Sequence, residues 1–196
     1  MTGRTLVAGV GNVFLRDDAF GVEVVRELAG RPRPDGVEIR DFGIRGVHLV
    51  YDLLNGCDLF VLVDAAPRGE APGTVTVVEV EMPDPGSLTS PVIDAHALTP
   101  DGIFALLASL GGRPGRSLLV ACEPADVSAG MGLSDPVREA VPHAARAVEE
   151  ILSRARPGQD GDEASGGGRG AGDAEHSGPG DGDRLAAGRE AAPRPT

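Results

Sequence analysis

Residues 59–63 read Leu-Phe-Val-Leu-Val, and Asp64 follows them directly. Five large apolar residues in a row, without the polar alternation of a half-exposed strand, are typical of a strand that helices cover on both faces. A second run of this kind, Ser-Leu-Leu-Val-Ala-Cys, occupies residues 117–122. Two such strands predict a sheet that lies between two layers of helices.

Strand and helix patterns alternate along the rest of the folded part. Further strands are predicted at residues 5–10 and 37–41, and an outer strand at 74–80. Helices are predicted at residues 18–29 (with Val22, Val25 and Ala29 on one face), 47–54, 99–110 and 134–153. This alternation predicts a three-layer α/β/α fold with a twisted, mostly parallel sheet of about five strands.

The composition changes after Arg154. Residues 155–196 contain one large aliphatic residue, Leu185, and are rich in glycine, proline and charged residues. Ordering the backbone costs about 1–2 kcal/mol per residue, which a segment with so little apolar surface does not recover. We therefore expect a folded domain at residues 1–154 and a disordered tail at residues 155–196.

The overall charge and the cysteines narrow the class of protein. The chain has 196 residues and a net charge of −12, which argues against a nucleic-acid partner because such proteins present basic surfaces. It has neither an apolar run of about 18 residues nor a signal-peptide pattern. Cys57 and Cys122 lie far apart in apolar runs, so neither a disulfide framework nor a C-x-x-C metal site is available. We expect a cytoplasmic protein that binds neither nucleic acid nor a membrane.

The turn after the first predicted strand contains Gly9, Gly11 and Asn12, and the acidic pair Asp17-Asp18 follows. Two glycines in a strand-to-helix turn suit a dinucleotide site. However, the third glycine of that motif is missing, and two carboxylates at the start of a helix would repel a phosphate. The aspartates can instead cap the helix. A cap needs only one of them and leaves its neighbour free to face a cleft.

Three polar side chains follow predicted strands or precede predicted helices: Asp18, Asp64 and His96. Ligands of such folds bind beyond the carboxyl ends of the strands, so the three can converge there. Two carboxylates and an imidazole suit a divalent metal such as zinc or nickel. They also suit chemistry without a metal, in which a carboxylate activates water and the imidazole moves a proton. Taken singly, Asp64 could be satisfied by loop N–H groups, and His96 could be an ordinary loop histidine.

The segment after the second predicted strand, residues 41–46, contains Gly43 and Gly46. Glycines there allow a positive φ or a close approach of the backbone to a ligand. An ordinary turn explains them equally well. Nucleophilic schemes find less support, because the G-x-S-x-G motif is absent and Cys122 is expected to pack as a small apolar group.

Taken in order, these motifs resemble those of the hydrogenase maturation endopeptidases. The resemblance extends over residues 4–153 and rests on these segments: 9–12, 17–21, 41–46, 63–65, His96 and 132–134. It implies a twisted sheet between helices and an enzyme that removes a C-terminal peptide from the large-subunit precursor of a nickel–iron hydrogenase after nickel insertion.

The resemblance also implies roles for individual residues. Asp18, Asp64 and His96 would be the catalytic residues and would bind a divalent metal, most simply the nickel that the precursor supplies. Asp18 is a glutamate in some relatives, one methylene longer. Gly43 and Gly46 would let the backbone approach the substrate peptide, while Gly9, Gly11, Asn12 and Asp17 shape the loop. The alternatives are a peptidase of related fold that acts on another precursor, and a non-catalytic metal-binding partner in maturation.

Overall fold

The computed structural model describes residues 3–82 and 99–155. Its strands are β1 (Thr5–Val10), β2 (Val37–Gly43), β3 (Leu59–Ala65), β4 (Val75–Glu79) and β5 (Arg116–Cys122). Its helices are the 3₁₀ turn η1 (Arg16–Ala19) and the α-helices α1 (Phe20–Ala29), α2 (Gly46–Leu53), α3 (Pro100–Ser109) and α4 (Asp135–Arg154). All the strands and α-helices predicted from the sequence are present, with ends that differ by one or two residues. The predicted tail lies outside the described residues except for Ala155.

The five strands form one sheet in the order β2-β1-β3-β5-β4. All neighbouring pairs are parallel except β4, which pairs antiparallel with β5 at the edge. The prediction of a mostly parallel sheet with an outer strand at 74–80 is confirmed. The strand order reverses direction between β1 and β3, and the crevice beyond the carboxyl ends of two such strands is where α/β sheets bind ligands.

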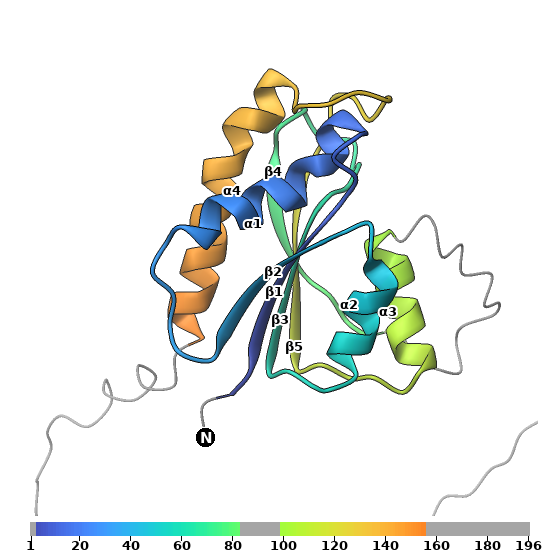
Figure 1. The fold of residues 1–196 in the computed structure, drawn as a ribbon, viewed down its shortest axis with the longest axis vertical. Coiled ribbons are helices and arrows are strands. Elements are labelled where there is room, and N and C mark those ends of the chain that lie inside the picture. The colour runs from blue at the N-terminus through green and yellow to red at the C-terminus, as the bar shows by residue number, and fades with distance from the viewer. Residues whose placement is uncertain (1–2, 83–98, 156–196) are drawn as a thin grey trace, which may run out of the picture. The chain divides into compact units, whose positions relative to one another are not determined.

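Helices cover both faces of the sheet, as Figure 1 shows: α1 and α4 lie on one face, and α2 and α3 on the other. Alternate residues of β3 enter the two cores, Val61 and Val63 with α1 and α4, and Phe60 and Leu62 with α2 and α3. Both faces are therefore apolar, which explains the uninterrupted run in the sequence. The same alternation turns the side chain of Asp64 toward the face of α2 and α3.

The start of α1 differs from the prediction. The helix begins at Phe20 rather than Asp18, and the acidic pair lies in η1, with no side-chain hydrogen bond capping α1. The alternative in which an aspartate caps this helix is wrong, because the Asp18 carboxylate accepts the N–H of Asn12 and the Asp17 carboxylate accepts donors of residues 125–134. Ala29 is exposed, and Leu28 takes the expected place in the core.

The two cysteines are both buried as free thiols. Burial raises the pKa of Cys57 to about 11 and that of Cys122 to about 12, so neither is a ready thiolate near neutral pH. Cys122 packs in the core with α1 and α4, as expected for a small apolar group. Across residues 3–82 and 99–155, no helix combines the length and the apolarity that a membrane span needs.

Candidate active site

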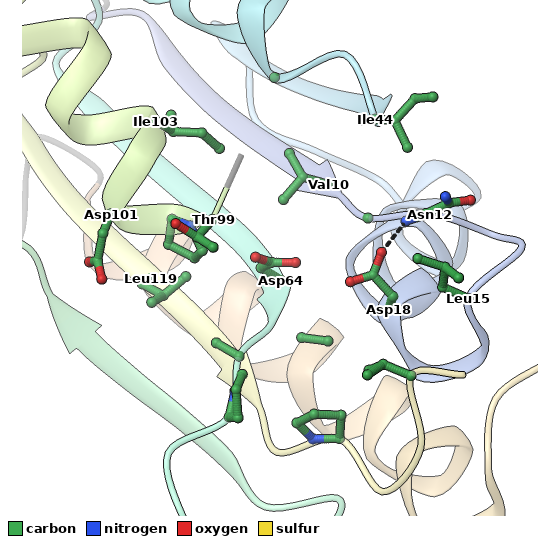
Figure 2. Close-up of a pocket in the computed structure, with 18 of the residues that line it drawn as sticks. Val10, Asn12, Leu15, Asp18, Ile44, Asp64, Thr99, Asp101, Ile103 and Leu119 are labelled. Carbon is green, nitrogen blue, oxygen red and sulfur yellow. Dashed lines mark hydrogen bonds between the residues drawn. The ribbon is translucent and has the colours of Figure 1, made fainter. Parts of the chain in front are cut away.

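A pocket of about 690 Å³ opens at the carboxyl edge of the sheet. Its lining comes from the turns after β1 and β2, the end of β3, the start of α3 and the segment after β5. Asp18 and Asp64 both line it (Figure 2). The pocket lies beyond β1 and β3, the strands between which the sheet order reverses.

Asp64 stands at the end of the most buried strand. β1 and β5 flank β3, and the residue opposite Asp64 in β5 is Ala121. Its side chain is 6% exposed and faces the pocket (Figure 2). Burial raises its pKa well above the ordinary value, and the nearby charge of Asp18 raises it further, against a lowering contribution from the N–H of Ala65. Its ionised form is therefore costly unless a cation or a donor approaches.

Asp18 reaches the same pocket from the turn after β1. Its Oδ2 accepts a hydrogen bond from the backbone N–H of Asn12 at 2.6 Å, which is drawn in Figure 2. Asn12 in turn accepts a bond from the N–H of Phe14 through its Oδ1, at 3.0 Å. Gly11 has a φ of +129°, and a Cβ there would overlap the carbonyl oxygen of Asp18. The turn therefore needs glycine at this position to bring the backbone against Asp18.

Gly9 and the 43–46 turn give the site its backbone frame. A Cβ on Gly9 would overlap the carbonyl oxygen of Gly21, so a glycine lets β1 lie directly against α1. Gly43 has a φ of +52°, and its carbonyl accepts the N–H of Gly11 at 3.0 Å. Gly43 and Gly46 both line the pocket, together with Ile44, whose side chain is 74% exposed. The two turns are thus joined at the mouth of the site.

Asp17 points away from the pocket lining and into the protein, where it is fully buried. Burial alone would raise its pKa, but the hydrogen bonds that it accepts from Ser134, Asp126 and Ala125 outweigh burial, and its pKa is lowered. The adjacent aspartates therefore have different environments.

His96, the third predicted ligand, lies outside the described residues. Three positions later, Thr99 lines the pocket as the N-cap of α3, where its hydroxyl accepts the N–H of Gly102 at 3.3 Å. Within residues 3–82 and 99–155, no group of three His, Cys, Asp or Glu side chains is placed to bind a metal ion. The structure thus brings together Asp18 and Asp64 of the predicted set, with Gly43 and Gly46 beside them.

Glu123 is a site residue that the sequence analysis missed. It directly follows β5, is 9% exposed, and accepts the backbone N–H groups of Arg68 at 2.6 Å and Glu70 at 3.2 Å. Arg68 lines the pocket, so Glu123 holds one of its walls. An acidic residue directly after a buried strand was the signal that singled out Asp64, and the same signal was available for Glu123.

The comparisons with known proteins place this chain and its fold in a family. A family model described as "HycI: Hydrogenase maturation protease" matches residues 22–153. The chain is 36% identical over 143 residues to the hydrogenase expression/formation protein HupM of Azotobacter chroococcum mcd 1, covering 70% of this chain and 68% of that protein. It is 32% identical over 155 residues to the hydrogenase 2 maturation protease of Escherichia coli K12, covering 78% and 91%.

Solved structures agree. The chain matches the hydrogenase maturating endopeptidase HybD from E. coli with a TM-score of 0.62 and 31% identity, covering 77% of this chain and 93% of that one. It matches a hydrogenase 2 maturation peptidase from Thaumarchaeota archaeon SCGC_AB-539-E09 with a TM-score of 0.60 and 30% identity, covering 76% and 98%. The chain belongs to the hydrogenase maturation protease family, as the resemblance in its sequence predicted, and protease activity is the activity that this family supports.

Proposed function

We propose that this protein removes the C-terminal extension of a nickel–iron hydrogenase large-subunit precursor once nickel has been inserted, with Asp18, Asp64 and His96 engaging the metal. The observation that carries the proposal is the convergence on one pocket of two carboxylates from different elements, η1 and β3. Asp18 lies in η1, after β1, and Asp64 is the last residue but one of β3; both line the 690 Å³ pocket at the reversal point of the sheet.

The chain allows His96 to join the two carboxylates. Thr99 lines the pocket, and three residues of extended chain span about 10 Å. His96 precedes Thr99 by three residues, so the length of chain between them permits its side chain to reach the pocket. The resulting donor set, two carboxylate groups and one imidazole, suits nickel(II), which accepts nitrogen and oxygen ligands.

In this proposal the nickel ion arrives as part of the substrate. A bound divalent ion polarises the scissile carbonyl and favours deprotonation of an attacking water. Burial and the nearby charge of Asp18 make Asp64 costly to ionise without a cation. Contact with a metal-loaded precursor relieves that cost, whereas a precursor without nickel leaves it. The same two side chains thereby make cleavage conditional on nickel loading.

Residues around the carboxylates would hold the peptide. Gly43 has no side chain, so its backbone can approach an extended substrate. Ile44 and Val127 line the pocket with side chains that are 74% and 51% exposed, which suits apolar contact with the precursor. Glu123 would keep the Arg68 wall in place through its two backbone hydrogen bonds.

The test is processing of nickel-loaded and nickel-free precursor by Asp18→Ala, Asp64→Ala and His96→Ala, followed by mass spectrometry of the large subunit. We expect all three variants to leave the nickel-loaded precursor at full length. Asp35→Ala and His48→Ala, which change exposed residues that do not line the pocket, are the matched controls and should process normally. Normal processing by all three site variants would overturn the proposal. Equal cleavage of nickel-free precursor by the wild-type protein would overturn the nickel dependence alone.

A further inference from the structure

Asp17 has no part in the chemistry above, yet its carboxylate is the most fully hydrogen-bonded acid in the described part of the chain. Its Oδ2 accepts the N–H groups of Ala125 and Asp126, both at 2.9 Å, and the hydroxyl of Ser134 at 2.8 Å. Its Oδ1 accepts the N–H of Ser134 at 2.6 Å. All four donors belong to one segment, residues 125–134, which lies more than a hundred residues further along the chain.

Backbone contacts strengthen the same connection. The N–H of Asp17 donates to the carbonyl of Asp126 and that of Arg16 to the carbonyl of Gly130, both at 3.1 Å. In the other direction, the N–H of Gly130 donates to the carbonyl of Phe14 at 2.9 Å. Arg16 also forms an ion pair with Asp126 at 3.2 Å. Residues 14–17 and 125–134 thus form one hydrogen-bonded unit.

Two features of this unit are unfavourable by themselves. Arg16 has a φ of +47°, a left-handed conformation that a residue with a long side chain adopts only where its surroundings impose it. Ser134 is the N-cap of α4, but its hydroxyl donates to Asp17 and forms no cap bond. Both features occur where residues 14–17 contact the 125–134 segment, so the contacts between the two segments compensate for the strain at Arg16 and for the missing cap bond of Ser134.

We propose that Asp17 is the positioning residue of the active site: its buried carboxylate anchors the η1 turn to the 125–134 segment and so holds Asp18 at the pocket. Asp18 is the next residue in that turn, so a shift of the anchored Asp17 moves the carboxylate that reaches the pocket. Val127, in the anchoring segment, lines the same pocket. This inference rests on the proposed function.

Asp17→Asn tests the inference with little change of shape. The carboxamide presents an NH₂ group where one carboxylate oxygen accepted a hydrogen bond, so at least one donor of the 125–134 segment loses its acceptor. In processing of nickel-loaded precursor, we expect kcat to fall by about 10–100-fold, the usual result of disturbing a residue that orients a metal ligand. KM for the precursor should change by less than about threefold, because the surfaces that contact the peptide remain.

Asp52→Asn is the matched control for a loss of stability. Asp52, like Asp17, is a hydrogen-bonded carboxylate, but it is only partly buried and has two arginine partners, one of which, Arg4, precedes β1 at the opposite end of the sheet. Both variants are assayed well below their melting temperatures. Asp52→Asn should keep kcat within about twofold of the wild type. If it loses as much kcat as Asp17→Asn, the effect is one of global stability and the inference is overturned.

Ser134→Ala provides a second, milder variant, which carries the test if Asp17→Asn does not fold. It removes the hydroxyl donor and leaves the three backbone donors. We expect kcat to fall by about fivefold, the equivalent of one hydrogen bond. If Asp18→Ala is inactive while folded Asp17→Asn and Ser134→Ala keep the wild-type kcat, only the positioning role fails. If Asp18→Ala processes normally, the positioning role fails, and if Asp64→Ala and His96→Ala also process normally, the proposed function fails with it.

Discussion

Replacing Asp64 with asparagine separates the effect of the buried carboxylate on stability from its proposed role in cleavage. Asparagine has almost the same shape, so the substitution leaves no cavity; it removes the charge and replaces one carboxylate oxygen with an NH₂ group. Because burial and Asp18 disfavour ionised Asp64, folding is penalised at every pH at which this group is ionised in the unfolded state. We expect the free energy of unfolding of Asp64→Asn to be about 1–2 kcal/mol higher than that of the wild type at neutral pH, a gain of the size that single stabilising substitutions commonly give. That gain corresponds to a rise in melting temperature of about 2–8 °C.

The raised pKa of Asp64 fixes how the stability difference between the wild type and Asp64→Asn changes with pH. A carboxyl whose folded pKa is raised holds its proton longer in the folded than in the unfolded state, so stability falls as the pH rises from the unfolded pKa, near 3.9, through the folded pKa. The advantage of Asp64→Asn should therefore shrink as the pH is lowered toward about 4 and be largest above the folded pKa. In parallel, the variant should leave nickel-loaded precursor uncleaved.

Urea unfolding of both proteins across this pH range measures the effect. Asp35→Asn, which removes an exposed carboxylate, should leave the free energy of unfolding within about 0.5 kcal/mol at every pH. A less stable Asp64→Asn, or a difference that does not vary with pH, would refute the reasoning. Either result would mean that loop N–H groups satisfy the Asp64 carboxylate and that its role is structural.

Three further predictions concern the frame of the site. Gly11→Ala should lower the free energy of unfolding by about 1–3 kcal/mol or more, because Gly11 has a positive φ and an added Cβ overlaps the Asp18 carbonyl. The control is Gly30→Ala, which should be nearly neutral in the same urea titration because nothing lies within 4 Å of the added Cβ and φ is −84°. Equal losses in the two variants would contradict this account. Because the pKa of Asp17 is lowered in the folded state, its ionised carboxylate stabilises the fold above the unfolded pKa, and this stabilisation is lost as the pH falls through the folded pKa. The wild type should therefore lose stability below about pH 4 more steeply than Asp17→Asn. Parallel acid-unfolding profiles of the two proteins would argue against this role of Asp17. Ile44→Ser and Val127→Ser should each raise KM for the precursor by about tenfold without changing the melting temperature. Leu110→Ser, which changes an exposed residue outside the pocket lining, should leave KM unchanged. An unchanged KM in both pocket variants would show that these side chains do not bind the substrate.

The layers of the fold are visible in the sequence because they depend on local patterns. The uninterrupted apolar runs at 59–63 and 117–122 identify strands with two covered faces, and the carboxyl ends of parallel strands share one edge. Asp18 and Asp64 could therefore be assigned to the same edge before any coordinates. The family was indicated by the order of the motifs along the chain, because the periodicity of apolar residues predicts only the type of fold.

The division of labour between Asp17 and Asp18 is different, because it depends on partners far along the chain. Both are acidic residues at a helix start, and local rules treat them as alternative caps. Only packing brings residues 125–134 against η1, so that Asp17 finds donors 108 to 117 positions away and turns inward while Asp18 faces the pocket. The elements follow from side-chain periodicity along the chain, whereas the partner of a buried carboxylate follows from which segments the tertiary structure brings together.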